Sequence, residues 1–138
     1  MSKHARPRVL VDMSATLLHH GHTRLLAAAA QIGYVVVGLA TDEEIERTKG
    51  YTPELPFDER RELLLAVRYV DEVVPAPWLI DDAFLDQHRI DLLIHGSDNR
   101  NPVAPERMKI VPRTEGVSST ELRARVLRAV SQVMLKEE

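Results

Sequence analysis

The segment His19-His20-Gly21-His22 carries side chains of a reactive type at a spacing that allows joint action. Residues three apart lie on one side of a first helical turn, so the imidazoles of His19 and His22 can point at one ligand. Gly21 lets a phosphate approach the backbone, and helix N-termini favour anions. We therefore expect a phosphate-binding pair. Histidines that only cap the helix or lie on the surface are the alternative. A zinc site is disfavoured, because His19 and His20 point apart on a helix and the chain has no cysteine.

A second group of phosphate-binding residue types opens the last helical segment. Arg113 and Gly116 come just before three hydroxyl residues, Ser118, Ser119 and Thr120. A guanidinium, backbone amides and hydroxyls suit a second phosphate group. Ser118 with Glu121 also fits a capping box, which is the purely structural interpretation. The two segments together predict a polyphosphate cradle, and no GxxxxGK[ST] loop occurs in the sequence.

Strands and helices must bring these two segments together. Apolar β-branched runs alternate with stretches of helical period, which is typical of a parallel sheet wrapped by helices. The predicted strands are 8–12, 34–39, 72–74, 91–95 and 108–111, and the predicted helices are 20–32, 42–47, 58–69, 80–88 and 118–135. Residues 48–56 are predicted to form a mobile loop. We expect an α/β fold, a Rossmann-like doubly wound five-stranded parallel sheet with helices on both faces. Its ligands should bind beyond the carboxyl ends of the strands, where the strand order reverses.

Length and composition predict a single soluble domain over residues 1–138, with 44 % hydrophobic and 28 % charged residues. No stretch is apolar enough to cross a bilayer, and the apolar run after the basic N-terminus is broken by Asp12, which disfavours a secretory signal. The absence of cysteine excludes disulfides and thiolate nucleophiles. A net charge of −3 provides no global attraction to nucleic acid or to an anionic membrane. We expect a cytoplasmic protein without nucleic-acid or membrane partners.

Four parts of the chain together resemble a known family: His19-x-Gly21-His22, Lys49 in its loop, the segment 68–73 (RYVDEV) and the segment 112–120 (PRTEGVSST). They are similar to the CTP-dependent cytidylyltransferases of the glycerol-3-phosphate cytidylyltransferase type. HxGH alone marks the wider nucleotidyltransferase superfamily, and the two longer segments narrow the resemblance to the cytidylyl branch. The resemblance implies CMP transfer from CTP with release of pyrophosphate. It also implies Mg²⁺ bound mainly through the CTP phosphates, and a homodimer.

Departures from that family concern the acceptor. Where the glycerol-3-phosphate enzymes have Gly-Thr-Phe-Asp, this chain has Met13-Ser14-Ala15-Thr16, and Ser97 replaces the first of two aspartates, of which Asp98 is kept. The segments 49–55 and 76–80 look more like phosphonate-pathway cytidylyltransferase domains of the fosfomycin type, which use 2-hydroxyethylphosphonate. Some of those domains are fused to a phosphoenolpyruvate mutase domain, so a longer bifunctional protein with this chain at its N-terminus stays open. A pocket that no longer pairs buried hydroxyls should reject glycerol 3-phosphate, and we therefore predict 2-hydroxyethylphosphonate as the acceptor.

The resemblance divides the expected site residues into three groups. The catalytic group contains His19, His22, Lys49 and Arg113. Nucleotide and phosphate binding is expected of Met13, Ser14, Gly21, Gly96, Asp98, Thr114, Val117, Ser118, Ser119 and Thr120. Acceptor binding is expected of Ser14, Ala15, Lys49, Arg60, Arg68 and Trp78. Solvated or ion-paired arginines are the alternative for Arg60 and Arg68, as is packing for Trp78. No metal ligand from the protein is expected.

Other functions remain open at this point. The chain would be a glycerol-3-phosphate cytidylyltransferase if the acceptor pocket were unchanged. An adenylyltransferase of the same superfamily would share the histidines and the serines, and a thermal shift with CTP against ATP separates the two. A flavodoxin-like carrier or a signalling receiver would explain the alternating pattern alone, but a receiver needs clustered acids at the first strand, where only Asp12 is present.

Overall fold

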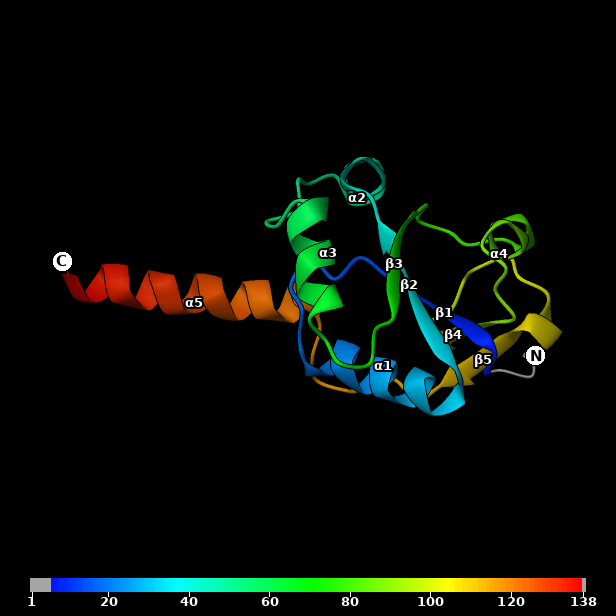
Figure 1. The fold of residues 1–138 in the computed structure, drawn as a ribbon. Helices are drawn as coiled ribbons and strands as arrows, with labels where there is room; N and C mark the ends of the chain where they lie inside the picture. Colours follow the sequence, from blue (N-terminus) through cyan, green and yellow to red (C-terminus); the bar gives the residue numbers. More distant parts are fainter. Residues whose placement is uncertain (1–5, 138) are drawn as a thin grey trace.

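The computed structural model describes residues 6–137 and contains one parallel five-stranded sheet (Figure 1). Its strands are β1 (Arg8–Met13), β2 (Tyr34–Ala40), β3 (Glu72–Ala76), β4 (Leu92–Gly96) and β5 (Met108–Val111). They are ordered β3-β2-β1-β4-β5, and every neighbouring pair is parallel. The strand order reverses between β1 and β4, so the carboxyl ends of these two strands flank the crevice in which such folds bind ligands.

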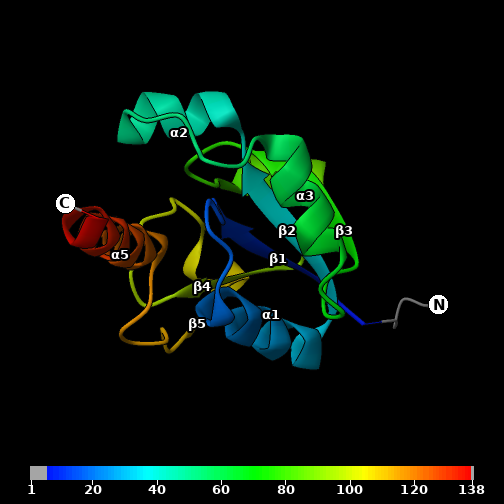
Figure 2. The ribbon, with the colours of Figure 1, turned by 90° about the vertical axis from the view of Figure 1, so that its left-hand side faces the viewer.

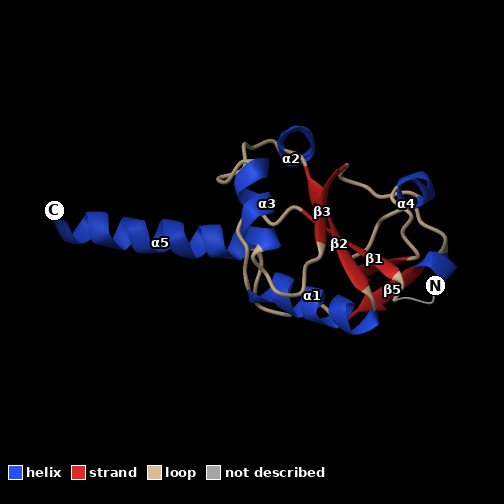
Figure 3. Ribbon diagram, viewed as in Figure 1, coloured by secondary structure: helices blue, strands red, loops and turns tan. Residues whose placement is uncertain are grey.

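Helices cover both faces of this sheet (Figure 3). Helices α1 (His20–Ile32) and α3 (Phe57–Leu65) share one core cluster with Val9 and Val11 of β1. Helix α4 (Asp82–Gln87) shares the second cluster with Leu10 of the same strand. Successive strand residues are therefore buried on opposite faces, which explains why the predicted strands are apolar at consecutive positions. The predicted doubly wound α/β sheet is confirmed.

Helix boundaries differ from the predictions where local hydrogen bonds stop or extend a helix. Helix α2 (Asp42–Lys49) includes Lys49, which the sequence pattern places in a loop, because the left-handed Gly50 (φ 80°) caps the helix only after it. Helix α3 ends at Leu65 instead of Tyr69, because the N–H groups of Ala66 and Val67 bond to carbonyls three residues back. A short 3₁₀ helix at Pro105–Arg107, which the pattern does not predict, precedes β5.

Helix α5 (Ser119–Glu137) projects away from the sheet as a long arm (Figures 1 and 2). Ser118 caps it, since its Oγ accepts the N–H of Glu121 at 3.0 Å. Several apolar side chains beyond its first turns are exposed: Val126, Leu127, Val130, Val133, Met134 and Leu135. Within residues 6–137, no helix combines the length and apolar character that crossing a membrane would require.

Candidate functional site

Two cavities open at the carboxyl ends of β1 and β4, where the strand order reverses. The first has a volume of about 420 Å³ and lies among the turn before α1, the start of α1 and the loop before α5. The second, of about 500 Å³, extends toward residues 77–79. The residues that line both cavities are Asp12, Met13, Ser14, Lys49, Trp78, His95 and Asp98. Each volume suits a small ligand, and the shared wall allows two ligands to meet.

His19 and His22 form a reciprocal cap at the N-terminus of α1. The N–H of Gly21 donates to Nδ1 of His19 at 3.1 Å, and the N–H of His19 donates to Nδ1 of His22 at 3.1 Å. The two ring centres lie 3.9 Å apart. Because each Nδ1 is an acceptor, a neutral ring carries its proton on Nε2. The fold therefore favours one tautomer in both imidazoles, with the proton on Nε2, and both residues line the first cavity.

Both imidazoles are held in the neutral form. Burial, together with a smaller effect of the neighbouring His19, lowers the pKa of His22 to about 4. The pKa of His19 is lowered by burial and by the nearby charges of His20 and Arg113. Near pH 7 the pair can donate hydrogen bonds to phosphate oxygens without adding fixed charges that repel each other. His20 is exposed and lines neither cavity, so the structure brings together only two of the three histidines.

Gly21 occupies a position that has no room for a side chain. A Cβ there would lie 2.9 Å from Cε1 of His19 and 3.1 Å from Cγ1 of Val117. Val117 is buried and belongs to the loop before α5, so the histidine turn and that loop pack against each other at Gly21. The glycine is therefore needed for this close approach as much as for access of a phosphate to the backbone.

The loop before α5 also lines the first cavity, through Arg113, Thr114, Val117, Ser118, Ser119 and Thr120. Two of the three hydroxyls already have structural partners. Ser118 caps α5, and Ser119 both donates to the carbonyl of Leu17 at 3.0 Å and accepts its N–H at 3.3 Å. The expectation that all three hydroxyls donate to phosphate is therefore corrected for Ser119, whose proton is used by Leu17. Arg113, Thr120 and the first-turn N–H groups of α5 are the better phosphate donors.

Lys49 lies at the wall that the two cavities share. Its Nζ is 5.4 Å from the centre of the Trp78 ring, a cation–π distance. Trp78 also lines both cavities, and its backbone N–H donates to Oε1 of Glu44 in α2 at 2.7 Å. Trp78 is therefore a cleft residue whose backbone is held by α2.

A third histidine, His95 at the end of β4, is a cleft residue that the sequence analysis did not single out. Its Nδ1 donates to Asp12 Oδ1 at 2.6 Å, and the other oxygen of Asp12 accepts from Asn101 Nδ2 at 3.2 Å. Nε2 of His95 lies 3.7 Å from an oxygen of Asp98. Burial lowers the pKa of His95, but the Asp12 hydrogen bond and the charges of Asp12 and Asp98 outweigh burial, so the net shift is upward. This ring therefore favours the charged form, unlike the pair on α1.

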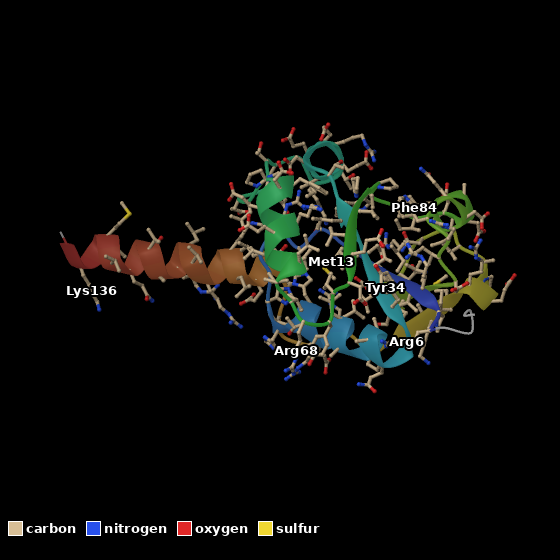
Figure 4. The ribbon with its side chains drawn as sticks, in the orientation of Figure 1. Arg6, Met13, Tyr34, Arg68, Phe84 and Lys136 are labelled. Atoms are coloured by element: carbon tan, nitrogen blue, oxygen red, sulfur yellow. The ribbon has the colours of Figure 1, made fainter. Side chains whose placement is uncertain are left out.

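Three residues expected to contact the acceptor lie outside both cavities: Ala15, Arg60 and Arg68. Ala15 is buried in the core cluster shared with α1, with a φ of 45°. Arg68 is exposed, follows α3 near the amino end of β3 and lies against Tyr69, whereas the cleft is at the carboxyl ends. Figure 4 labels Arg68 at the lower edge of the molecule, over α1, and Met13 in its middle. Neither Ala15 nor Arg68 lines the two cavities, so the structure does not bring them together with the other predicted site residues.

Arg60 is a structural residue. It is 1 % exposed, and its guanidinium donates to the carbonyls of Leu55, Ser14 and Ala40 and to the carboxylate of Asp42 at 2.6–2.9 Å. Because the guanidinium is buried among these partners, it does not reach an acceptor anion in the cleft. Instead of contacting an acceptor, Arg60 links the turn after β1 to α2 through its hydrogen bonds to Ser14 and Asp42. The ion-paired alternative describes this arginine correctly.

The remaining predicted residues, Met13, Ser14, Gly96 and Asp98, line the cleft. Sequence reasoning missed several others that also line it: Asp12, Thr16, Tyr51, His95, Asn101 and Arg123. For Asp12 and His95 a signal existed, because each stands at or near the carboxyl end of a strand beside the strand reversal. Arg123 carried no such signal, since it reaches the cleft only through the docking of α5.

No group of three or more His, Cys, Asp or Glu side chains able to hold a metal ion occurs among the residues that the structure describes. Asp98, which is half exposed, and Asp12 are the carboxylates in the lining. A divalent cation would therefore need most of its oxygen ligands from a bound phosphate chain. The expectation of Mg²⁺ carried by a nucleotide fits this donor set and stays a prediction.

Comparisons with known proteins agree with this arrangement. Residues 15–111 match the family model described as "Cytidylyltransferase-like". An ethanolamine-phosphate cytidylyltransferase from Arabidopsis thaliana is 38 % identical over 91 % of this chain and 33 % of its own length. Choline-phosphate cytidylyltransferase A from Homo sapiens is 36 % identical over 88 % of this chain and 36 % of its own. The chain thus spans about a third of the length of these curated relatives.

A solved structure provides a likeness of fold alone. The lipopolysaccharide core biosynthesis protein from Thermoplasma volcanium aligns with a TM-score of 0.67 at 18 % identity, covering 80 % of this chain and 100 % of that one.

The names of the sequence relatives support the resemblance to cytidylyltransferases. The acceptors in those names are ethanolamine phosphate and choline phosphate, which differ from both glycerol 3-phosphate and a phosphonate.

Proposed function

Because the chain belongs to the cytidylyltransferase-like family, we propose that it transfers CMP from CTP to a small phosphorus-containing anion and releases pyrophosphate. The observation that carries the proposal is the His19–His22 pair, which lines the first cavity together with Arg113 and the first residues of α5. A triphosphate bound in this cavity can meet neutral imidazole donors as well as a guanidinium and helix amides.

The reaction needs no general base from the protein. An oxygen of the acceptor is already anionic near pH 7, so it can attack the α-phosphorus of CTP directly. A new P–O bond forms to the acceptor while the bond between the α-phosphorus and the bridging oxygen of the β-phosphate breaks. Both electrons of that bond leave with pyrophosphate, and the products are a CMP-linked anhydride and pyrophosphate. Rate enhancement then comes from positioning and from stabilising the transferred phosphate's negative charge.

The protein residues take distinct parts in this reaction. His19 and His22 hydrogen-bond the oxygens of the transferred phosphate, and Lys49 lies where it can bridge that phosphate and the acceptor. Arg113 and the first turn of α5 hold the leaving pyrophosphate. Mg²⁺, which we expect to arrive with CTP, would neutralise the phosphate chain when bound. Asp98 is the exposed carboxylate near Arg113, at 3.5 Å.

For the acceptor we propose 2-hydroxyethylphosphonate, on the basis of the charges around the second cavity. Both oxygens of Asp12 are already bonded, to His95 and Asn101, and its side chain is 11 % exposed. Lys49 and Arg100 add cations to the lining, and His95 favours its charged form. Such a cavity suits an anion whose tail is neutral, because an ammonium would find no unpaired buried carboxylate among the described lining residues.

Ethanolamine phosphate is the competing acceptor, favoured by the names of the relatives and by Trp78, whose face could bind an ammonium in place of Lys49. Pyrophosphate release with CTP and Mg²⁺ tests the two directly. The sharpest pair is 2-hydroxyethylphosphonate against 2-aminoethylphosphonate, which differ only in the polar group of the tail and its charge. We expect the hydroxyl compound to have a kcat/KM at least about tenfold higher.

Three further compounds complete this experiment. Ethanolamine phosphate, choline phosphate and glycerol 3-phosphate should be weaker substrates than 2-hydroxyethylphosphonate. An equal or higher kcat/KM for any of them replaces our acceptor by that compound. Substituting ATP for CTP tests the nucleotide in the same assay, and turnover with ATP but not CTP would show an adenylyltransferase. The expected homodimer, the fused mutase domain and the cytoplasmic location stay predictions.

A further inference from the structure

Arg123, in the second turn of α5, joins three segments that are distant in the sequence. Its Nη2 donates to Thr16 Oγ1 and to Glu54 Oε1, each at 2.7 Å, and its Nε donates to the other oxygen of Glu54. Its Cζ lies 4.6 Å from the centre of the Tyr51 ring. The turn before α1, the loop after α2 and α5 therefore meet at one side chain.

These contacts differ from an ordinary surface ion pair, which contributes little to stability. Arg123 binds Glu54 through two donors, and bidentate pairs of this kind are shorter and more directional. The hydroxyl that it also binds belongs to Thr16, which is 1 % exposed. The Arg123 hydrogen bond also lowers the pKa of Glu54, against the opposing effect of burial. The cluster of Thr16, Tyr51, Glu54 and Arg123, which we name the Arg123 clasp, is thus a network with a fixed geometry.

The loop held by the Arg123 clasp begins directly after Lys49. Gly50 has a φ of 80°, and its N–H donates to the carbonyl of Glu46 at 3.0 Å, so the loop leaves α2 directly after Lys49 in a fixed direction. Pro53 is buried and anchors the middle of the loop. The contacts from α5 to Tyr51 and Glu54 restrain the loop on either side of Pro53.

We propose that Arg123 is a positioning residue that, through Glu54 and Tyr51, holds Lys49 at the wall shared by the two cavities. The proposal rests on the proposed function only where it concerns the effect of Lys49 on the acceptor. Arg123 stands on the helix that follows the phosphate-binding loop, and the loop that it holds begins directly after Lys49, which lines both cavities. Loss of the clasp should therefore affect use of the acceptor more than binding of CTP.

Substitutions of both partners test the clasp. Arg123→Met removes the donors and keeps most of the apolar stem, and Glu54→Gln keeps the shape but removes the charge. Arg128→Met is the matched control, because Arg128 lies on the same helix, is exposed and, among the described residues, pairs only with Glu121, at 3.5 Å. Arg123→Lys keeps the charge without the fork and should fall between wild type and Arg123→Met.

Limited trypsin digestion measures how firmly the backbone at Lys49 is held, and it does not depend on enzymatic activity of the protein. Trypsin cuts after Lys49, so we expect the ligand-free Arg123→Met variant to be cleaved at Lys49–Gly50 at least about fivefold faster than wild type, while Arg128→Met matches wild type. Fluorescence of Trp78, the only tryptophan, should change in Arg123→Met because Lys49 lies against its ring. The double variant Arg123→Met/Glu54→Gln should be cleaved no faster than Arg123→Met alone, since the two substitutions disrupt the same interaction.

Kinetics then separate positioning from a merely structural role. In Arg123→Met we expect the kcat/KM for the acceptor to fall about tenfold or more, while the Kd for CTP stays within about threefold of wild type. Equal behaviour of Arg123→Met and Arg128→Met in both assays overturns the proposal, as does an equal loss of CTP binding and acceptor use. If Arg123→Met does not fold, Glu54→Gln alone carries both measurements. If wild type releases no pyrophosphate with any acceptor, the proposed function fails, and the trypsin result still decides whether Arg123 holds Lys49.

Discussion

Two histidine environments lie within the same cleft and have opposite electrostatic character. His19 and His22 are capped by backbone N–H groups at a helix N-terminus, and their pKa values are lowered. His95 donates to Asp12 at the end of β4, and its pKa is raised. The same side chain therefore has a lowered pKa at the N-terminus of α1 and a raised pKa at the end of β4. Burial lowers the first two pKa values, whereas the hydrogen bond and charge of Asp12 raise the third.

This difference matches the two halves of the proposed reaction. Neutral donors can form stronger hydrogen bonds as negative charge builds up on the transferred phosphate in the transition state. They bind the same phosphate less tightly in the bound CTP. The raised pKa of His95 keeps its ring protonated to higher pH beside the second cavity, where we propose that an anionic acceptor binds. The comparison can be tested by substituting the histidines of either group and measuring whether turnover, CTP binding or use of the acceptor changes.

The largest effect is expected from the neutral pair. His19→Ala and His22→Ala should each lower kcat by about 10²-fold or more, because each removes a donor to the transferred phosphate. His20→Ala is the matched control, since His20 is exposed and outside both cavities. Circular dichroism and thermal unfolding check that the fold persists. Near-normal turnover in both variants would remove the pair from the mechanism.

A smaller loss is expected from Gly21→Ala. Its Cβ would lie 2.9 Å from Cε1 of His19, so the imidazole must move while the backbone stays helical. We expect kcat to fall about tenfold with little change in the Kd for CTP. Alanine is otherwise favourable in a helix, which offsets part of the crowding against Val117, so we expect the melting temperature to fall by only a few degrees. Wild-type kcat in this variant would mean that the exact position of His19 is unimportant.

The charged environment predicts a pH effect on the acceptor alone. Because the pKa of His95 is raised above 6.5, the ring loses its proton only as the pH rises through that higher value. We expect the KM for the acceptor to rise a few-fold across this range while the KM for CTP stays flat. In His95→Gln the KM for the acceptor should be higher and independent of pH. An identical pH profile in wild type and His95→Gln would assign the effect to another group.

The smallest effect is on stability. With a pKa of about 4 in the folded protein and 6.5 in the unfolded chain, His22 stabilises the fold above pH 6.5, and this stabilisation is lost as the pH falls toward 4. Between pH 6.5 and 5.5 the loss from His22 amounts to about 1 kcal/mol. Urea unfolding at these two pH values should show it in wild type and not in His22→Asn. His95 acts in the opposite direction, since its raised pKa favours folding below 6.5 and that contribution is lost at higher pH.

Much of the fold could be predicted because it depends on local pattern. Runs such as Val35–Val37 are apolar at every position because a parallel strand is buried on both faces, and this needs no knowledge of the partners. The ends of helices were less predictable. Lys49 belongs to α2 because Gly50 takes a left-handed conformation one residue later, and a glycine in a polar stretch is equally typical of a loop.

The site divides along the same line. His19, Gly21, His22 and the 113–120 loop could be found because their spacing has meaning within one turn of helix or one loop. Arg60 could not be placed, since its partners are carbonyls of three other segments that only folding brings within 3 Å. Asp12 and His95 pair across 83 residues, and no spacing rule connects them.

The sequence by itself determined the alternation of strands and helices, the histidine cap and the phosphate-binding loop, because each depends on backbone geometry over a few residues. The tertiary structure alone decided the charge state of each histidine, because burial and a partner's charge set a pKa. It also decided which arginines face the cleft. Arg60 became a buried link between segments and Arg123 a clasp on the loop that follows Lys49, because long flexible side chains take the partners that packing brings within reach.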